Sequence, residues 1–263
     1  MAAAPLACGQ TYNREFKPMA DFESQIARGR ASSDVDIDTG LRNFMLGVYA
    51  KMALGLVLTG TIAWTIANVP AVRQYFFASD EYGRLHMTLL GLAARWVPLV
   101  ILLIAAFTRA FSNPQASGFL YWMVVSSIGV SGALWFIIYN LGSVAGIFLI
   151  TASAFGAMSL WGYVTKRDMS TWGNFLFMAL WGLILASIAS FFIPGMSLAI
   201  SAIGVLLFAV FTAYDTQMLK RVYYNVRGSQ YSMAVATNMG ALNFYLDFVN
   251  MFQFLLNLGG SRR

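Results

Sequence analysis

Long apolar stretches recur along this 263-residue chain and alternate with shorter polar connections. Seven of them reach, or nearly reach, the roughly 20 helical residues that cross a hydrocarbon core about 30 Å thick. These stretches occupy residues 43–67, 95–112, 118–139, 143–164, 172–193, 197–218 and 239–258. Backbone groups in lipid must be hydrogen-bonded within their own segment, which predicts a helix for each stretch. The pattern therefore predicts an all-α polytopic membrane protein with seven transmembrane helices.

The polar remainder divides the chain into two parts. Residues 1–41 are polar, mixed in charge and without apolar periodicity, so the sequence predicts a disordered cytoplasmic tail. Residues 42–260 hold all seven stretches, and their short connections predict antiparallel neighbours in one bundle. The longest connection, residues 68–94, is expected to be a loop on the outer side.

Charge supports this interpretation and orients the bundle. The chain is 59% hydrophobic and 11% charged, with a mean hydropathy of +0.65. With the N-terminus inside, the inner segments hold eleven Lys and Arg residues and the outer segments hold five, while Lys51 falls within the first stretch. The positive-inside rule therefore favours a cytoplasmic N-terminus. This topology accounts for the net charge of +6 without a nucleic-acid partner.

Motifs for catalysis are weak in this sequence. The single cysteine, Cys8, allows no internal disulfide or thiolate metal site, and no nucleotide-binding glycine motif occurs. The stretch GVSG at residues 129–132 matches the nucleophile motif of rhomboid-type intramembrane serine proteases. Such a serine needs a histidine base, and the only histidine, His86, lies in the predicted outer loop. Helix packing by small residues is the favoured interpretation, so we expect neither an enzyme nor a cofactor.

Two of the eleven acidic residues stand apart because they fall inside predicted spans. Asp215 lies in the sixth stretch and Asp247 in the seventh, at depths where an ionisable group is costly and usually functional. At about 100° per residue, Asn243 and Asn250 share the helix face of Asp247, and Thr212 shares that of Asp215. We therefore expect a polar seam between these two helices.

The predicted depths place both carboxyl groups in the inner half of the bundle, where the second stretch ends at Arg109. The sixth stretch ends near Leu219 and the seventh begins near Met239. Two close carboxylates in a low dielectric cannot both ionise cheaply, so Asp215 and Asp247 are expected to share one proton. Arg109 would favour their charged forms, and protonation would weaken its hold. The arrangement predicts a pH-sensitive latch.

The oxygen atoms of this seam suit a hard cation such as Ca²⁺ better than a soft metal. Asp215 and Asp247 are the candidate ligands for a transient Ca²⁺ ion. The candidate cation pathway consists of the polar residues on the same two helix faces: Thr212, Asn243 and Asn250. Lys51, about two turns into the first stretch, is either a snorkelling side chain or a counter-ion for the aspartates.

Four stretches resemble the Bax inhibitor-1 family, and in particular its bacterial members. They are VYAKMALGLVLTG in the first span, SLWGYVTKRDMS after the fourth, FTAYDTQML ending the sixth and ALNFYLDFVNMFQFLLNL in the seventh. The similarity covers residues 41–258. It implies six helices around a central seventh and a pH-sensitive Ca²⁺ leak. It also implies that Asp215 and Asp247 form a di-aspartyl pH sensor, which Arg109 helps to latch.

The resemblance leaves two functions open. The first is a Ca²⁺ leak channel gated by protonation of Asp215 and Asp247. The second is a non-conducting regulator of a membrane-anchored AAA protease, or of stress and cell survival. The likeness to bacterial members favours an inner-membrane location. Lys51 stands where the resemblance implies a neutral polar or aromatic residue.

Overall fold

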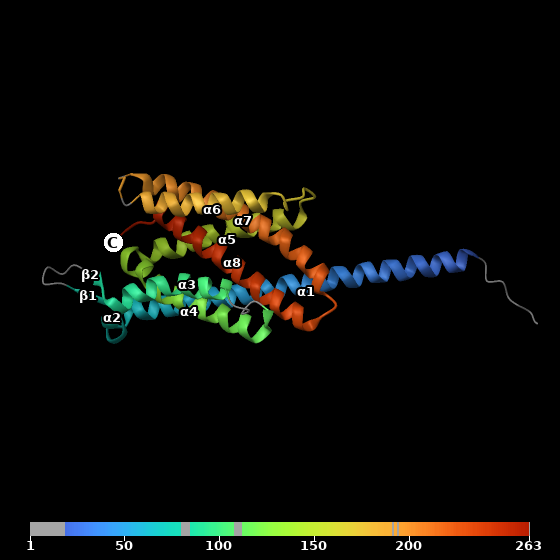
Figure 1. The fold of residues 1–263 in the computed structure, drawn as a ribbon, viewed down its shortest axis with the longest axis horizontal. Coiled ribbons are helices and arrows are strands. Elements are labelled where there is room, and N and C mark those ends of the chain that lie inside the picture. The colour runs from blue at the N-terminus through green and yellow to red at the C-terminus, as the bar shows by residue number, and fades with distance from the viewer. Residues whose placement is uncertain (1–18, 80–84, 108–111, 191, 194, 263) are drawn as a thin grey trace, which may run out of the picture. The chain divides into compact units, whose positions relative to one another are not determined.

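The computed structural model describes residues 19–79, 85–107, 112–190, 192–193 and 195–262. Residues 1–18, the first part of the predicted tail, lie outside this description, as does Arg109. The chain divides after Arg42 into two units. In the first unit, residues 19–42 are helical, although the sequence predicted no regular structure there. The second unit holds the helical bundle (Figure 1).

Each of the seven apolar stretches corresponds to a helix (Figure 1). These helices are α1 Met19–Asn68, α3 Leu89–Phe107, α4 Pro114–Ile138, α5 Leu141–Val164, α6 Trp172–Ala189, α7 Met196–Val226 and α8 Gln230–Gly259. Within the described residues, five helices are long and apolar enough to cross a membrane: α1 from Thr39 onward, α4, α5, α6 and α7. Helix α3 is apolar but shorter, and α8 falls below this measure. The all-α membrane architecture is confirmed, whereas the count of seven spans is not.

The helix ends follow from local chemistry. Asn113 precedes α4, and its side chain accepts a hydrogen bond of 2.9 Å from the backbone amide of Gln115. Ser229 caps α8 in the same way, accepting from Ser232 at 3.2 Å. Such caps satisfy backbone donors that the first helical turn leaves free. Before α7, Gly195 has a φ of 87°, which a glycine adopts without strain, so the chain can turn there.

The connection between α1 and α3 is folded, and the expectation of a loop was wrong. It contains α2 Pro70–Phe76 and an antiparallel hairpin of β1 Phe77–Ser79 and β2 Leu85–Met87. Phe77 is buried in a small core with Ile66 of α1 and Ala133 of α4. His86 pairs with Ala78 in the hairpin and is exposed. These apolar contacts, which hydropathy alone does not reveal, hold the connection against the bundle.

Two predicted helix ends were also wrong. Helix α7 continues to Val226 and α8 begins at Gln230, about two turns beyond the predicted ends at Leu219 and Met239. Leu219 and Tyr223, one turn apart, are both buried, and the Tyr223 ring packs at a tilt against Phe44 with ring centroids 5.5 Å apart. An amphipathic extension of this kind stays helical although its outer face is polar.

Helix α8 forms the core of the bundle. It packs against α4, α5 and α7, and hydrogen bonds join it to α1 (Figure 1). Phe244, Tyr245 and Met251 are almost completely buried on it. Helix α3 packs on α4, and α6 packs on α7. The helix expected at the centre therefore has α1, α4, α5 and α7 as its direct neighbours.

Contacts at both ends show that α8 runs parallel to α4. The Asn238 side chain donates hydrogen bonds of 2.9 Å to the Pro114 carbonyl and the Ser117 hydroxyl at the start of α4. Just after α4 ends, the Tyr139 hydroxyl donates to Asn257 Oδ1 at 3.0 Å. Helix α8 thus covers the same depth as α4. We call the two ends of the bundle the Asn238 end and the Asn257 end.

The backbones of α5 and α7 touch at Gly162. A Cβ atom at this position would lie 2.3 Å from the carbonyl oxygen of Ala213 and 2.8 Å from its Cα. Small residues allow such close helix packing in membranes, where dispersion contacts replace the hydrophobic effect between helices. Ala213 is itself fully buried. The contact fixes the position of α7 close to Asp215.

We expect Gly162→Ala to destabilise the protein by about 1–3 kcal/mol, because the added methyl group forces two backbones apart. Gly156→Ala on the same helix is the matched control, because its Cβ would meet nothing within 4 Å. That control should be neutral or stabilising by up to about 1 kcal/mol through helix propensity. Thermal unfolding in detergent measures both variants. Equal melting temperatures would contradict the proposed contact.

Candidate functional site

The α7–α8 interface is tight because glycines line it. A Cβ atom on Gly240 would lie 2.7 Å from Leu219 Cδ1, and one on Gly204 would lie 2.6 Å from the Phe254 ring. The early part of α8 thus meets the late part of α7, and the reverse holds at the other end. The two helices are antiparallel, and Asp215 and Asp247 lie along their interface.

The two aspartates are close enough to repel each other electrostatically. Asp247 is only 5% exposed, and Asp215 is half-buried. No donor within the described part of the chain reaches Asp247 Oδ2. A buried charge without a partner is expensive, so this site favours a proton or a cation beside it. The pairing of Asp215 with Asp247 stays a prediction, and so does the role of Arg109, which lies outside the described residues.

A pocket of about 120 Å³ opens beside Asp215. The amide of Asn243 and the ring of Phe244 line it from α8, and Met218 lines it from α7. Water needs about 10–15 Å³ and polar partners, so this pocket has the size and chemistry to hold it. Asp215 is thus the member of the pair that has access to water or an ion.

The predicted pathway residues have different environments. Asn243 is exposed and lines the pocket with Asp215. Thr212 is fully buried, and its hydroxyl donates to the Phe208 carbonyl of its own helix at 2.9 Å. Asn250 is half-buried and lies outside the pocket lining. The structure therefore brings Asn243, but neither of the other two, into the pocket of Asp215.

Lys51 has polar and aromatic partners at the Asn238 end. Its ammonium group donates to Asn238 Oδ1. It also lies 5.2 Å from the ring centroid of Tyr121 and 5.9 Å from that of Trp122, within reach of cation–π attraction. The Tyr121 hydroxyl donates to the Lys51 carbonyl at 2.7 Å. The side chain thus joins α1, α4 and α8, and its hydrogen bond goes to an amide instead of a carboxylate.

Gln217, which the sequence analysis did not single out, holds the α5–α6 connection against α7. It is 8% exposed, and its Oε1 accepts from the Met169 amide while its Nε2 donates to the Arg167 carbonyl, both at 2.7 Å. Beside it, Asp168 and Arg221 form the one salt bridge found within the described residues. The sequence feature that could have identified Gln217 is an amide side chain two positions after Asp215. This connection anchors α7 near the pocket.

Buried hydroxyl groups join the helices next to the aspartates. Tyr49 of α1 is hydrogen-bonded to Ser159 of α5, which is 3.0 Å from Thr216 Oγ1 of α7. On the other side, Thr59 Oγ1 lies 2.6 Å from the hydroxyl of Tyr245 on α8. Each of these hydroxyls has a protein partner, in contrast to Asp247 Oδ2.

The fold and this seam define a helical integral membrane protein with a buried and a half-buried acidic residue at a helix interface. The chain belongs to the Bax inhibitor family, because the family described as "Inhibitor of apoptosis-promoting Bax1" matches residues 41–263. The resemblance read from the sequence is therefore confirmed.

Bacterial relatives match over nearly their whole length. An uncharacterized protein of Caulobacter vibrioides is 47% identical over 93% of this chain and 100% of its own. The inner membrane protein YbhL of Escherichia coli K12 is 39% identical over 89% of this chain and 98% of its own. The protein RP147 of Rickettsia prowazekii is 37% identical over 88% and 95%, respectively.

Replacing Gln217 with leucine should loosen the α5–α6 connection. The variant leaves the Met169 amide and the Arg167 carbonyl without their partner, at a cost of about 1–3 kcal/mol for each group that stays buried. Limited proteolysis with trypsin after Lys166 and Arg167 measures this loosening. Asp168→Asn is the control, because an exposed ion pair contributes little. Cleavage at the wild-type rate in Gln217→Leu would exclude the anchoring role.

Asp168 should not contribute to any pH response near neutrality. Hydrogen bonds from Ser170, followed by the Arg221 partner, lower the pKa of Asp168 to about 2. Its stabilising effect is complete above the unfolded pKa of about 3.9 and is lost as the pH falls through about 2. In thermal unfolding, Asp168→Asn should therefore match the pH profile of the wild type between about pH 5 and 8. The two profiles should diverge only below about pH 4. If the two profiles diverged near pH 6, Asp168 would titrate far above the pKa that these partners give it, and the assignment of its partners would be wrong.

Proposed function

We propose that this protein is a Ca²⁺ leak pathway gated by protonation of Asp215 and Asp247. The observation that carries the proposal is a buried carboxylate, Asp247, with an oxygen that no described donor reaches. It interacts with a second carboxylate, Asp215, which lines a pocket. A site of this kind changes its charge and its packing together when a proton arrives.

Protonation changes the interaction between the two carboxyl groups from repulsion to attraction. Two ionised carboxylates repel each other, and the repulsion is weakly screened because Asp247 is buried. A single shared proton replaces that repulsion with a hydrogen bond. A second proton, bound at lower pH, makes the pair neutral. The doubly charged pair attracts water and cations into the pocket most strongly, and the neutral pair does not. The two states therefore favour different separations of α7 and α8.

The donor chemistry supports Ca²⁺ as the transported ion. Asp215 and Asn243 offer oxygen atoms at the pocket, and Asp247 on the same helix interface adds a second carboxylate; hard cations prefer such ligands. A resident Ca²⁺ site needs about six to eight oxygen ligands, and two carboxylates with one amide supply fewer. Within the described residues, no group of three acidic, histidine or cysteine side chains could hold a metal. These properties suit an ion in transit.

The location and orientation form part of the proposal. The E. coli relative is named an inner membrane protein, and we place this chain in the same membrane. Several basic residues lie near the Asn238 end, at the C-terminal ends of α5 and α7: Lys166, Arg167, Lys220, Arg221 and Arg227. The positive-inside rule supports the proposal that this end and the N-terminus are cytoplasmic.

A Ca²⁺ flux assay in liposomes that contain a Ca²⁺-sensitive dye tests this function. The wild type should give a pH-dependent flux above that of empty liposomes. The double variant Asp215→Asn with Asp247→Asn has nearly the shape of the neutral pair, so it should show at every pH the flux that the wild type reaches at low pH. Asp168→Asn, an exposed carboxylate variant on the same chain, should keep the wild-type pH dependence.

Other outcomes of the assay separate the alternatives. A wild-type flux equal to that of empty liposomes at every pH would favour the second function, a non-conducting regulator of a membrane-anchored AAA protease. A flux that keeps its pH dependence in the double Asn variant would preserve the leak and remove the gate from these two residues.

A further inference from the structure

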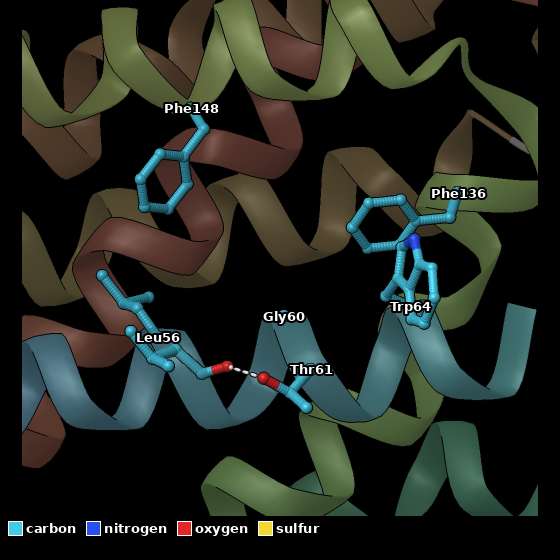
Figure 2. Close-up of a pocket in the computed structure, with 7 residues that line it drawn as sticks. Leu56, Gly60, Thr61, Trp64, Phe136 and Phe148 are labelled. Atoms are coloured by element: carbon cyan, nitrogen blue, oxygen red, sulfur yellow. Dashed lines mark hydrogen bonds between the residues drawn. The ribbon is translucent and has the colours of Figure 1, made fainter.

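An apolar groove of about 440 Å³ lies on the membrane-spanning part of the bundle, between α1 and α5 (Figure 2). Helix α1 forms one wall, and Phe148 of α5 points toward it from the opposite wall, while Phe136 of α4 and Trp64 lie toward one end (Figure 2). The residues that line it are Leu56, Val57, Gly60, Thr61, Trp64, Phe136 and Phe148. The volume lies within the range of small-molecule sites.

The lining offers little to water. The hydroxyl of Thr61 donates to the Val57 carbonyl at 2.8 Å, so this donor is already hydrogen-bonded within its own helix (Figure 2). A buried water needs two to four polar partners, and the side chains around this space are otherwise apolar or aromatic. The space beside Gly60 is open, because a Cβ atom there would meet nothing within 4 Å. An apolar occupant is therefore favoured.

The groove is continuous with the surface that this integral membrane protein presents to lipid. Apolar side chains beside it are largely exposed: Leu54 at 60%, Val57 at 67%, Leu149 at 66% and Ile150 at 58%. Inside a bilayer the hydrophobic effect does not distinguish lipid from protein, so contacts are made by close packing. A groove left empty would forfeit the dispersion contacts of its walls. A lipid chain already beside the opening can supply them.

The direction of the groove matches that of a lipid chain. Trp64 lies four residues, about 6 Å, from the end of α1 at Asn68, and tryptophan is enriched at the headgroup level of membranes. Leu56 lies about 12 Å deeper along the helix. We propose that this groove binds one acyl chain of a membrane phospholipid, with the headgroup near Trp64 and the chain extending toward Leu56.

The bound chain would contact the central helix through one aromatic residue. The Phe148 ring lies 5.2 Å from that of Phe248 and 6.2 Å from that of Phe252, centroid to centroid. Both partners are buried on α8. A chain against Phe148 thus supports α8 from the side of α5.

Gly60→Phe tests the site because its side chain would fill the groove from within. Gly182→Phe on α6 is the matched control, since Gly182, like Gly60, lies in a helix with nothing within 4 Å of its Cβ. Native mass spectrometry of each protein, purified in mild detergent, measures retained phospholipid. The wild type and Gly182→Phe should retain one phospholipid, and Gly60→Phe should retain at least about tenfold less. Equal retention in all three proteins would overturn the proposal.

A second measurement on the wild-type chain does not depend on the folding of a variant. A phospholipid with a diazirine in its acyl chain is incorporated into proteoliposomes, and the labelled peptides are mapped after illumination. Labelling should concentrate on residues 56–64 relative to the exposed apolar face of α6 at residues 175–185. Equal labelling of the two segments would overturn the proposal. The proposal would also be overturned if the wild type and Gly182→Phe each formed dimers and Gly60→Phe did not, because the groove would then be an interface between copies of this chain.

Discussion

Inside the bundle, a polar side chain must find its partner within the protein or in a pocket, because lipid supplies none. The structure satisfies this constraint for its buried hydroxyl and amide groups. Ser159 is hydrogen-bonded to Tyr49 and lies within hydrogen-bond distance of Thr216, and Gln217 is hydrogen-bonded to two backbone groups. Asp247 Oδ2 is the exception within the described residues. Among the described residues, buried neutral polar side chains have partners and one buried carboxylate oxygen has none, so the electrostatic cost falls at one interface.

The surroundings of that interface are firmly held. At the Asn238 end, hydrogen bonds tie α8 to the start of α4, and Gln217 ties α7 to the α5–α6 connection. Gly162 brings α5 against α7 through backbone contact. These contacts tie α8 to α4, and α7 to α5, around the interface that contains Asp215 and Asp247. In the proposed gate, a proton would act on one helix interface within a bundle that is tied together around it.

Sequence reasoning found the helices and the aspartates because both are local signals. Apolar runs locate helices in lipid, and a carboxyl group within such a run is conspicuous. The ends of α7 and α8 were missed because Tyr223 extends an apolar face into a polar stretch, which mean hydropathy does not reveal. The Lys51–Asn238 hydrogen bond joins residues 187 positions apart, and no local pattern encodes it. Pairings of that range are set by the packing of α1 on α8, which follows only from the assembled fold.

The two faces of α8 explain how a polar site and an apolar groove can share one helix. Asp247 and Phe248 are adjacent, so they point about 100° apart, one toward the seam with α7 and the other toward Phe148 and Phe155 of α5. Any shift of α8 that the carboxylates require must therefore be absorbed by this aromatic contact. Protein interiors are densely packed and resist such shifts, but the Phe148 ring also borders the groove, which opens to lipid. Fluid acyl chains can rearrange, whereas packed side chains resist rearrangement. Movement of α8 therefore costs the least free energy on its side next to the groove.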